Sequence, residues 1–218
     1  MAIDDIEYLP FRGVTFRVST QSHSSSAECP DLAQLVGLFH HDARTLGTFQ
    51  RVDVERLPEI PRRLLAHNEH MTVTVESHHR SPVDVDVLHT WETDGVYARE
   101  ILLRRQSDGA VVQFGIVRIR WEHLPPEVRR EIERRERPLG RILIEHHVLR
   151  RVECAALWEI EPGDDLRQWL GLRPAERTYG RTAWIHVGGE PAVELLEVVV
   201  PDEAVARRGG SDRRGGER

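Results

Sequence analysis

A run of alternating apolar and polar residues between positions 71 and 121 constrains the fold of this chain more than any other feature. The segments MTVTVESHH, VDVDVLHTW, YAREILLRR and VVQFGIVRIRW all repeat with a period of two. That period matches the side chains on one face of a β-strand. The links are short, and Asp-Gly pairs at 94–95 and 108–109 are typical of hairpin turns. We therefore predict a four-stranded antiparallel meander over 71–121.

The flanking segments add helices and further strands. Helical spacing and start signals predict helices over 31–39, 58–68, 124–136 and 163–172, with a short helix or turn at 138–147. Strands are predicted over 148–160, 177–187 and 192–200, whereas residues 41–56 show no clean period. The fold class is therefore α+β: an antiparallel sheet of about six or seven strands with helices packed against it.

The chain has 218 residues, which suits one domain with a substantial core. Residues 1–28 include the polar run STQSHSSSAE and are expected to be a flexible N-terminal segment. Residues 29–201 are predicted to form the single domain. Residues 202–218 contain ARRGGSDRRGGER, which has almost no apolar content, and are expected to be a disordered tail.

Net charge and hydropathy limit the classes of binding partner that we expect. The formal net charge is −6, so no excess of positive charge is available to neutralise phosphates, and we expect no nucleic-acid partner. No apolar run approaches membrane-spanning length, and we expect no membrane partner. The start MAIDDIEYLPF lacks the basic and apolar regions of a signal peptide, so a cytoplasmic protein is expected.

Three His-His pairs, at 40–41, 78–79 and 146–147, suggest a metal site at first sight. Adjacent residues on a strand point to opposite faces, so His78 and His79 are not expected to share an ion. Cys29 and Cys154 are the only cysteines and form neither a zinc-binding pattern nor a nucleophile signature. Nucleotide-binding motifs are also missing from the sequence. We therefore expect no metal and no cofactor.

One arginine stands on an apolar strand face. In YAREILLRR, Arg99 shares a face with Tyr97, Ile101 and Leu103, and a buried arginine needs an anionic partner. In AVELLEVVVP, Glu194 and Glu197 each share a face with apolar residues. Two interpretations follow. Either an Arg–Glu pair holds the sheet together, or a cavity carries a cation and a carboxylate and suits a flat, apolar acid with a carboxylate and a hydroxyl.

Several segments in order resemble the chorismate pyruvate-lyase family, in its actinobacterial and archaeal 4-hydroxybenzoate-synthase branch. They are YAREILL, RPLGRIL and YGRTAWIHVGGEPAVELLEVVVP, supported by HNEHMTVTVE and LPPEVRREI, and the match covers residues 57–201. The resemblance implies an antiparallel sheet with helices that enclose a ligand. It also implies a cofactor-independent carbon–oxygen lyase that eliminates pyruvate from its small-molecule substrate, chorismate, to give 4-hydroxybenzoate.

The resemblance also implies site residues. Arg99 would bind the ring carboxylate, and Glu197, rather than Glu194, would lie near the ring hydroxyl; these two are the catalytic candidates. Leu139 would cover the ring, and Met71 matches a methionine that lines the substrate site. A second cation for the enolpyruvyl carboxylate would be one of three arginines: Arg141, Arg151 and Arg181.

Two alternatives remain open at the level of sequence. The same fold serves as the effector-binding domain of GntR-type transcription regulators, so the chain is alternatively a non-catalytic module that binds an aromatic or sugar acid. The second alternative is a sibling enzyme that makes another hydroxybenzoate from chorismate. The oligomeric state is not predicted.

Overall fold

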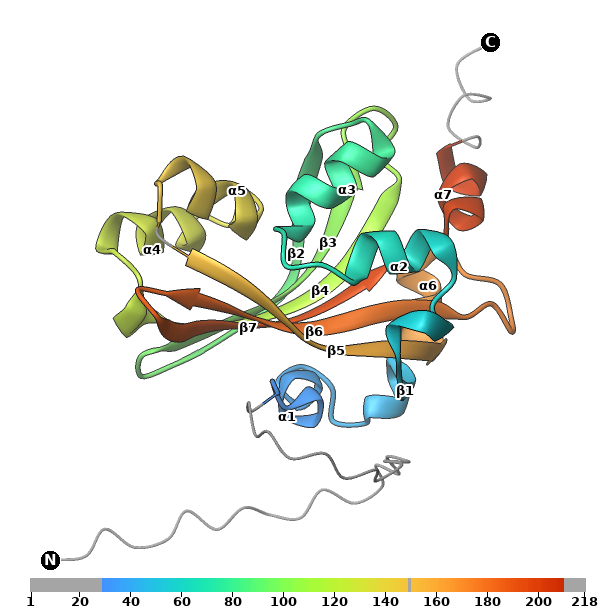
Figure 1. Ribbon diagram of the computed structural model, residues 1–218, viewed down its shortest axis with the longest axis horizontal. Helices are drawn as coiled ribbons and strands as arrows, with labels where there is room; N and C mark the ends of the chain where they lie inside the picture. Colours follow the sequence, from blue (N-terminus) through green and yellow to red (C-terminus); the bar gives the residue numbers. More distant parts are fainter. Residues whose placement is uncertain (1–28, 149, 210–218) are drawn as a thin grey trace, which may run out of the picture.

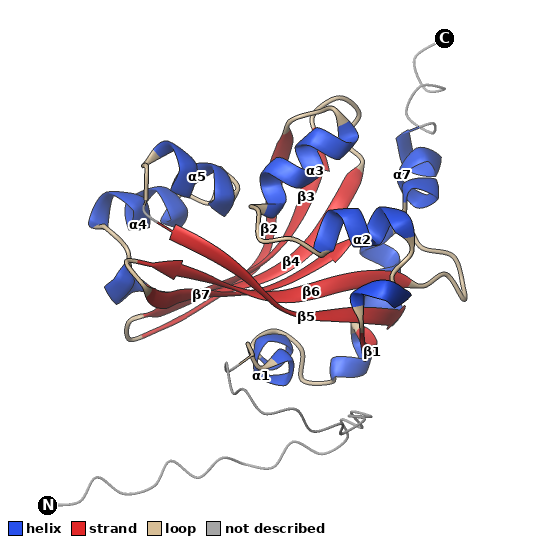
Figure 2. Ribbon diagram, viewed as in Figure 1, coloured by secondary structure: helices blue, strands red, loops and turns tan. Residues whose placement is uncertain are grey.

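The protein, described here from a computed structural model that covers residues 29–148 and 150–209, is built on one antiparallel sheet with helices on both faces (Figures 1 and 2). The sheet has seven strands in the order β1-β5-β6-β7-β4-β3-β2. Its strands are β1 (Gly47–Val52), β2 (Val83–Thr93), β3 (Val96–Arg105), β4 (Val111–Arg120), β5 (Arg150–Pro162), β6 (Thr178–Val187) and β7 (Glu190–Val199).

The α-helices are short. They are α1 (Leu32–Gly37), α2 (Glu59–Leu65), α3 (Met71–His79), α4 (Pro126–Glu133), α5 (Leu139–Glu145), α6 (Asp164–Leu170) and α7 (Asp202–Gly209). Three 3-10 turns, η1 (Ala43–Thr45), η2 (Val54–Arg56) and η3 (Trp121–His123), join them to the strands. The predicted fold class, α+β with an antiparallel sheet and packed helices, is confirmed. None of the described helices is long and apolar enough to cross a membrane.

The predicted meander has three strands rather than four. β2, β3 and β4 pair in sequence order, but the segment 71–79 forms helix α3. The strand prediction there was wrong because Met71 and Val75 are spaced for a helix as well as for a strand. In the helix these two side chains are buried, whereas Val73, which the alternation places with them, is 47% exposed.

Two further expectations differ from the structure. The expected disordered tail is wrong over Asp202–Gly209, which form α7: two acidic residues occupy its first turn, and Ala204 and Val205 are buried. Strand β1 lies in the region where the sequence shows no period. The segment 1–28, expected to be flexible, and residues 210–218 lie outside the described residues.

The two faces of the sheet carry different neighbours. On one face, Phe114 of β4 stacks on Trp169 of α6, with ring centroids 5.6 Å apart, and Arg118 of β4 donates to Gln34 of α1. Alternate residues of the same strands face the other way, toward the layer that contains α3 and α5 (Figure 2). The polar residues of interest lie between this second layer and the sheet.

Candidate binding cavity

A small cavity lies between the sheet and the first turns of α3 and α5. Its volume is about 40 Å³. Four residues singled out from the sequence line it together: Met71, Arg99, Leu139 and Glu197. Arg181 of β6 also lines it. Strands β3, β4, β5, β6 and β7 supply the floor, and the two helices supply the roof.

Arg99 occupies the middle of β3 and is completely buried. It lies between Thr90 of β2 and Val117 of β4 in the sheet register. Nη2 of its guanidinium donates to the carbonyl of Arg137 at 3.4 Å, and Nε and Nη1 have no hydrogen-bond partner among the described residues. Desolvation lowers the pKa of Arg99 to about 10, so the group remains charged at pH 7. A buried cation with two free donors is matched by an anion.

Glu197 is not the partner of Arg99. It lies opposite Arg181 in the pairing of β6 with β7 and accepts from Nε of Arg181 at 2.7 Å. One of the two interpretations required an Arg–Glu pair inside the sheet. Such a pair exists, but its arginine is Arg181 and not Arg99.

Arg181 also holds the loop between α2 and α3. Its Nη1 donates to the carbonyl of His67 at 2.7 Å, and its Nη2 donates to that of Glu69 at 3.2 Å. This fully buried guanidinium thus connects β7 to the loop that leads into Met71 at the start of α3. Its hydrogen bonds are satisfied inside the protein, in contrast to those of Arg99.

The remaining charged candidates lie elsewhere. Glu194 faces the opposite side of the sheet, where Arg118 binds it with Nε–Oε1 at 2.9 Å. Arg141 pairs with Glu76, and Arg151 pairs with Glu153 at 2.8 Å on the surface. Among the three arginines considered as a second cation, Arg181 is the one that lines the cavity.

The roof of the cavity is apolar and closely packed. Met71 and Leu139 are the first residues of α3 and α5, and both are buried. A Cβ at Gly140 would lie 2.8 Å from Oγ1 of Thr72, so the glycine allows the two helices to approach. A cavity of about 40 Å³ is smaller than the roughly 150 Å³ that binds benzene, so a ring-sized ligand enters only when this roof moves.

Sequence reasoning missed three polar residues of the cavity: His70, Thr72 and Gln113. Gln113 of β4 is buried, and its Oε1 has no hydrogen-bond partner among the described residues. In VVQFGIV it shares a face with Val111 and Val117, which is the signal that identified Arg99. His70 precedes α3, and burial, followed by the charges of Arg150 and Arg181, lowers its pKa to about 4. No sequence signal distinguishes this neutral imidazole from the other histidines.

Comparisons with known proteins give structural matches only. No family model matches the chain, and no curated protein matches it. Among solved structures, PhnF from Mycobacterium smegmatis is similar, with 11% identity, a TM-score of 0.45 and coverage of 62% of this chain. The possible transcriptional regulator YydK from Bacillus subtilis has 10% identity, a TM-score of 0.40 and coverage of 56%. A GntR-family regulator from Bacillus cereus has 12% identity, a TM-score of 0.39 and coverage of 55%.

The similarity covers unequal shares of these proteins. It spans 64% of the PhnF chain, 58% of the YydK chain and 92% of the B. cereus chain. The effector domain of PhnF, as a separate structure, is covered over 89% of its length with a TM-score of 0.45.

These comparisons correct the expectation of an enzyme. The similar structures are named as transcriptional regulators or as their effector domains, so the prediction of a carbon–oxygen lyase acting on chorismate is wrong. The segments that resemble the lyase family specify the sheet and the cavity, but a fold does not determine an activity. In addition, Glu197, the proposed catalytic carboxylate, is bound to Arg181.

Proposed function

We propose that this domain is a non-catalytic module that binds a small organic acid, aromatic or sugar-derived, through its carboxylate. The observation that carries the proposal is the guanidinium of Arg99, which is fully buried and has Nε and Nη1 unpartnered at the wall of a cavity. A buried guanidinium with free N–H donors is matched by the oxygens of a carboxylate.

Gln113 supplies a second point of recognition. Its free Oε1 accepts a hydrogen bond, so it suits a hydroxyl donor on the ligand. Gln113 pairs in register with Leu103, four residues from Arg99 on β3. The backbone positions of the two residues are therefore separated by roughly 13 Å along the strand direction, at about 3.4 Å per residue. The apolar residues between them, including Ile101, favour a ring or a carbon chain in the middle of the ligand.

The specific roles of the site residues belong to the same proposal. Arg99 binds the carboxylate, and Leu139 and Met71 cover the apolar body of the ligand. Glu197 contributes indirectly: it keeps Arg181 in place, and Arg181 keeps the loop before Met71 in place.

Ligand-dependent thermal stabilisation tests this proposal. We expect an acid of the correct shape, present at one hundred times its Kd, to stabilise the folded state by about 2.7 kcal/mol. For a domain of this size that corresponds to a rise in Tm of roughly 5–11 °C. The panel contains benzoate, 4-hydroxybenzoate, chorismate, glucuronate and gluconate, and the matched controls are the corresponding amides or methyl esters.

The amides and esters keep the shape of each acid but lose its charge, so we expect them to give no shift. We also expect every acid that binds to be recovered chemically unchanged. Equal stabilisation by an acid and its neutral amide would contradict a site based on the charge of Arg99.

A further inference from the structure

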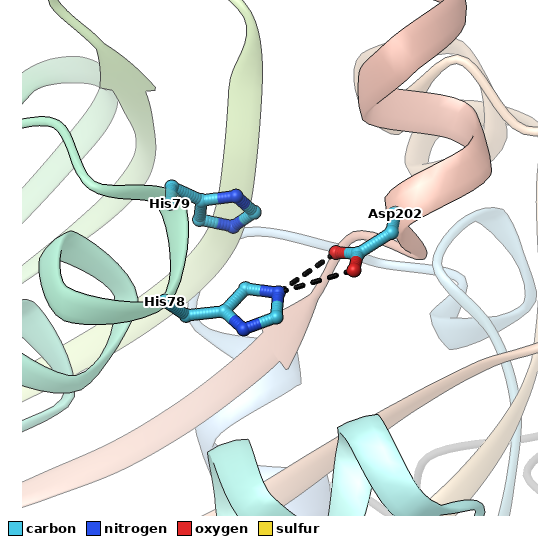
Figure 3. Close-up of side chains that lie close together, drawn as sticks. All are labelled: His78, His79 and Asp202. Carbon is cyan, nitrogen blue, oxygen red and sulfur yellow. Dashed lines mark hydrogen bonds and ion pairs between the residues drawn. The ribbon is translucent and has the colours of Figure 1, made fainter.

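The end of α3 meets the start of α7 at a cluster of three side chains that the proposed function does not use. His78 and His79 are the last two residues of α3, and Asp202 is the first residue of α7. One donor atom from each lies within 4.8 Å of the other two. Figure 3 shows both imidazole rings and the carboxylate directed toward the same space.

The helix explains why two consecutive histidines lie together. Successive residues on an α-helix are rotated by about 100°, compared with about 180° on a strand. The ring centroids of His78 and His79 are 4.7 Å apart, with the ring planes at 78°. On the predicted strand these two side chains would have pointed to opposite faces, whereas on the observed helix they are neighbours.

One pair of these donor groups is already in contact. His78 lies next to the anion, with its Nε2 at 2.9 Å and 3.2 Å from the two carboxylate oxygens of Asp202.

We propose that His78, His79 and Asp202 form a binding site for Zn²⁺. Two imidazole nitrogens and one carboxylate oxygen are a donor set that this borderline-soft ion accepts, and water completes its coordination. Donor atoms around a tetrahedral zinc with bonds of about 2.0–2.1 Å are about 3.3 Å apart. The cluster therefore contracts when the ion binds, which brings the end of α3 and the start of α7 closer together.

Arg63 of α2 competes with the metal in the apo state. Its Nη2 lies 2.9 Å from Nδ1 of His78, which accepts its hydrogen bond while Nε2–H points to Asp202. A metal on Nε2 leaves the ring proton on Nδ1, where it opposes the Arg63 donor. Arg63 is exposed and can turn to solvent, so it weakens the site without blocking it.

The other two His-His pairs provide internal comparisons. His146 also has a carboxylate neighbour, with its Nε2 2.5 Å from Glu131, and His40 has Glu100 at 2.6 Å. Within the described residues, the group at 78–79 is the one in which three potential ligands gather. His146→Gln is therefore a matched control, because it removes a histidine of a His–carboxylate pair that has no third donor.

Isothermal titration of the full chain with ZnCl₂ tests the proposal, together with the visible absorption spectrum of the Co²⁺ form. We expect one zinc per chain in the wild type and in His146→Gln. His79→Gln and Asp202→Asn should each weaken the affinity by roughly 100-fold or more, because loss of a direct ligand exceeds the 10–100-fold effect of losing a supporting contact. The intense Co²⁺ bands of low-coordinate geometry should disappear in both variants.

Arg63→Gln gives a result that a merely structural His78–Asp202 pair does not predict. We expect it to bind zinc more tightly than the wild type, because the competing donor to Nδ1 is removed. Asp202→Asn preserves size and lies at a half-exposed position, so it decides the question if His79→Gln fails to fold. The proposal is wrong if the wild type binds no zinc, or if Asp202→Asn binds it as tightly as the wild type.

Discussion

Replacing Arg99 with methionine is expected to abolish binding of the acid while leaving the protein at least as stable as the wild type. Removing one partner of a buried, hydrogen-bonded charge pair costs on the order of 3–5 kcal/mol of binding free energy. At about 1.4 kcal/mol per factor of ten, the Kd rises by roughly two to four orders of magnitude. Titration calorimetry with the acid that gives the largest thermal shift measures this change.

The expected stability of Arg99→Met follows because no described residue forms an ion pair with Arg99. Nε and Nη1 of Arg99 have no hydrogen-bond partner within the described residues. Desolvation of this buried cation therefore destabilises the folded protein, and no ion pair within the described residues offsets that effect. Methionine fills a similar length with apolar atoms. We expect the free energy of unfolding to be unchanged or to rise by about 1–4 kcal/mol, in line with apolar replacements of buried charges.

Arg99→Lys is the control for this experiment. Lysine retains the charge but loses the planar pair of donors, so binding should weaken by about tenfold rather than disappear. A clear fall in the Tm of Arg99→Met, with normal acid binding by the folded fraction, would mean that Arg99 supports the sheet and does not bind a ligand.

The buried arginine at position 99 could be found from the sequence because two simple rules meet there. Strand periodicity places Arg99 on an apolar face, and the cost of burying a charge requires a partner. The same rules apply to Gln113 in VVQFGIV, but a single uncharged amide on a strand face is a weaker signal. The identity of the partner of Glu197 was not accessible, since it depends on the order of β6, β7 and β4 in the sheet.

Segments with two compatible periods mark the limit of prediction from sequence. MTVTVESHH satisfies the strand pattern, and tertiary packing of Met71 and Val75 nevertheless selects a helix. On a strand the side chains of the two consecutive histidines would point to opposite faces, whereas on the helix their rings are neighbours. An error in the local structure of nine residues thus concealed a candidate metal site.

Replacing Arg181 with methionine is expected to have the opposite effect to the same change at Arg99, although both arginines line one cavity and both are fully buried. Arg181→Met leaves Glu197 buried without its cation and leaves the carbonyls of His67 and Glu69 without a donor. Breaking a buried pair from one side costs about 3–5 kcal/mol of folding stability. For a domain of this size the Tm falls by roughly 6–20 °C.

A double-mutant cycle separates the ion pair from the loop contacts. Glu197→Leu alone leaves Arg181 charged and buried, whereas the double variant Arg181→Met/Glu197→Leu removes both charges and should recover much of the lost stability. The part that is not recovered reports the carbonyls of the loop before Met71. Urea denaturation of the four proteins measures these terms, and strictly additive effects of the two substitutions would show that Arg181 and Glu197 do not act as a pair. Opposite stability changes at Arg99 and Arg181 would assign one buried guanidinium to the ligand and the other to the fold, because within the described part of the chain only Arg181 is paired with an anion.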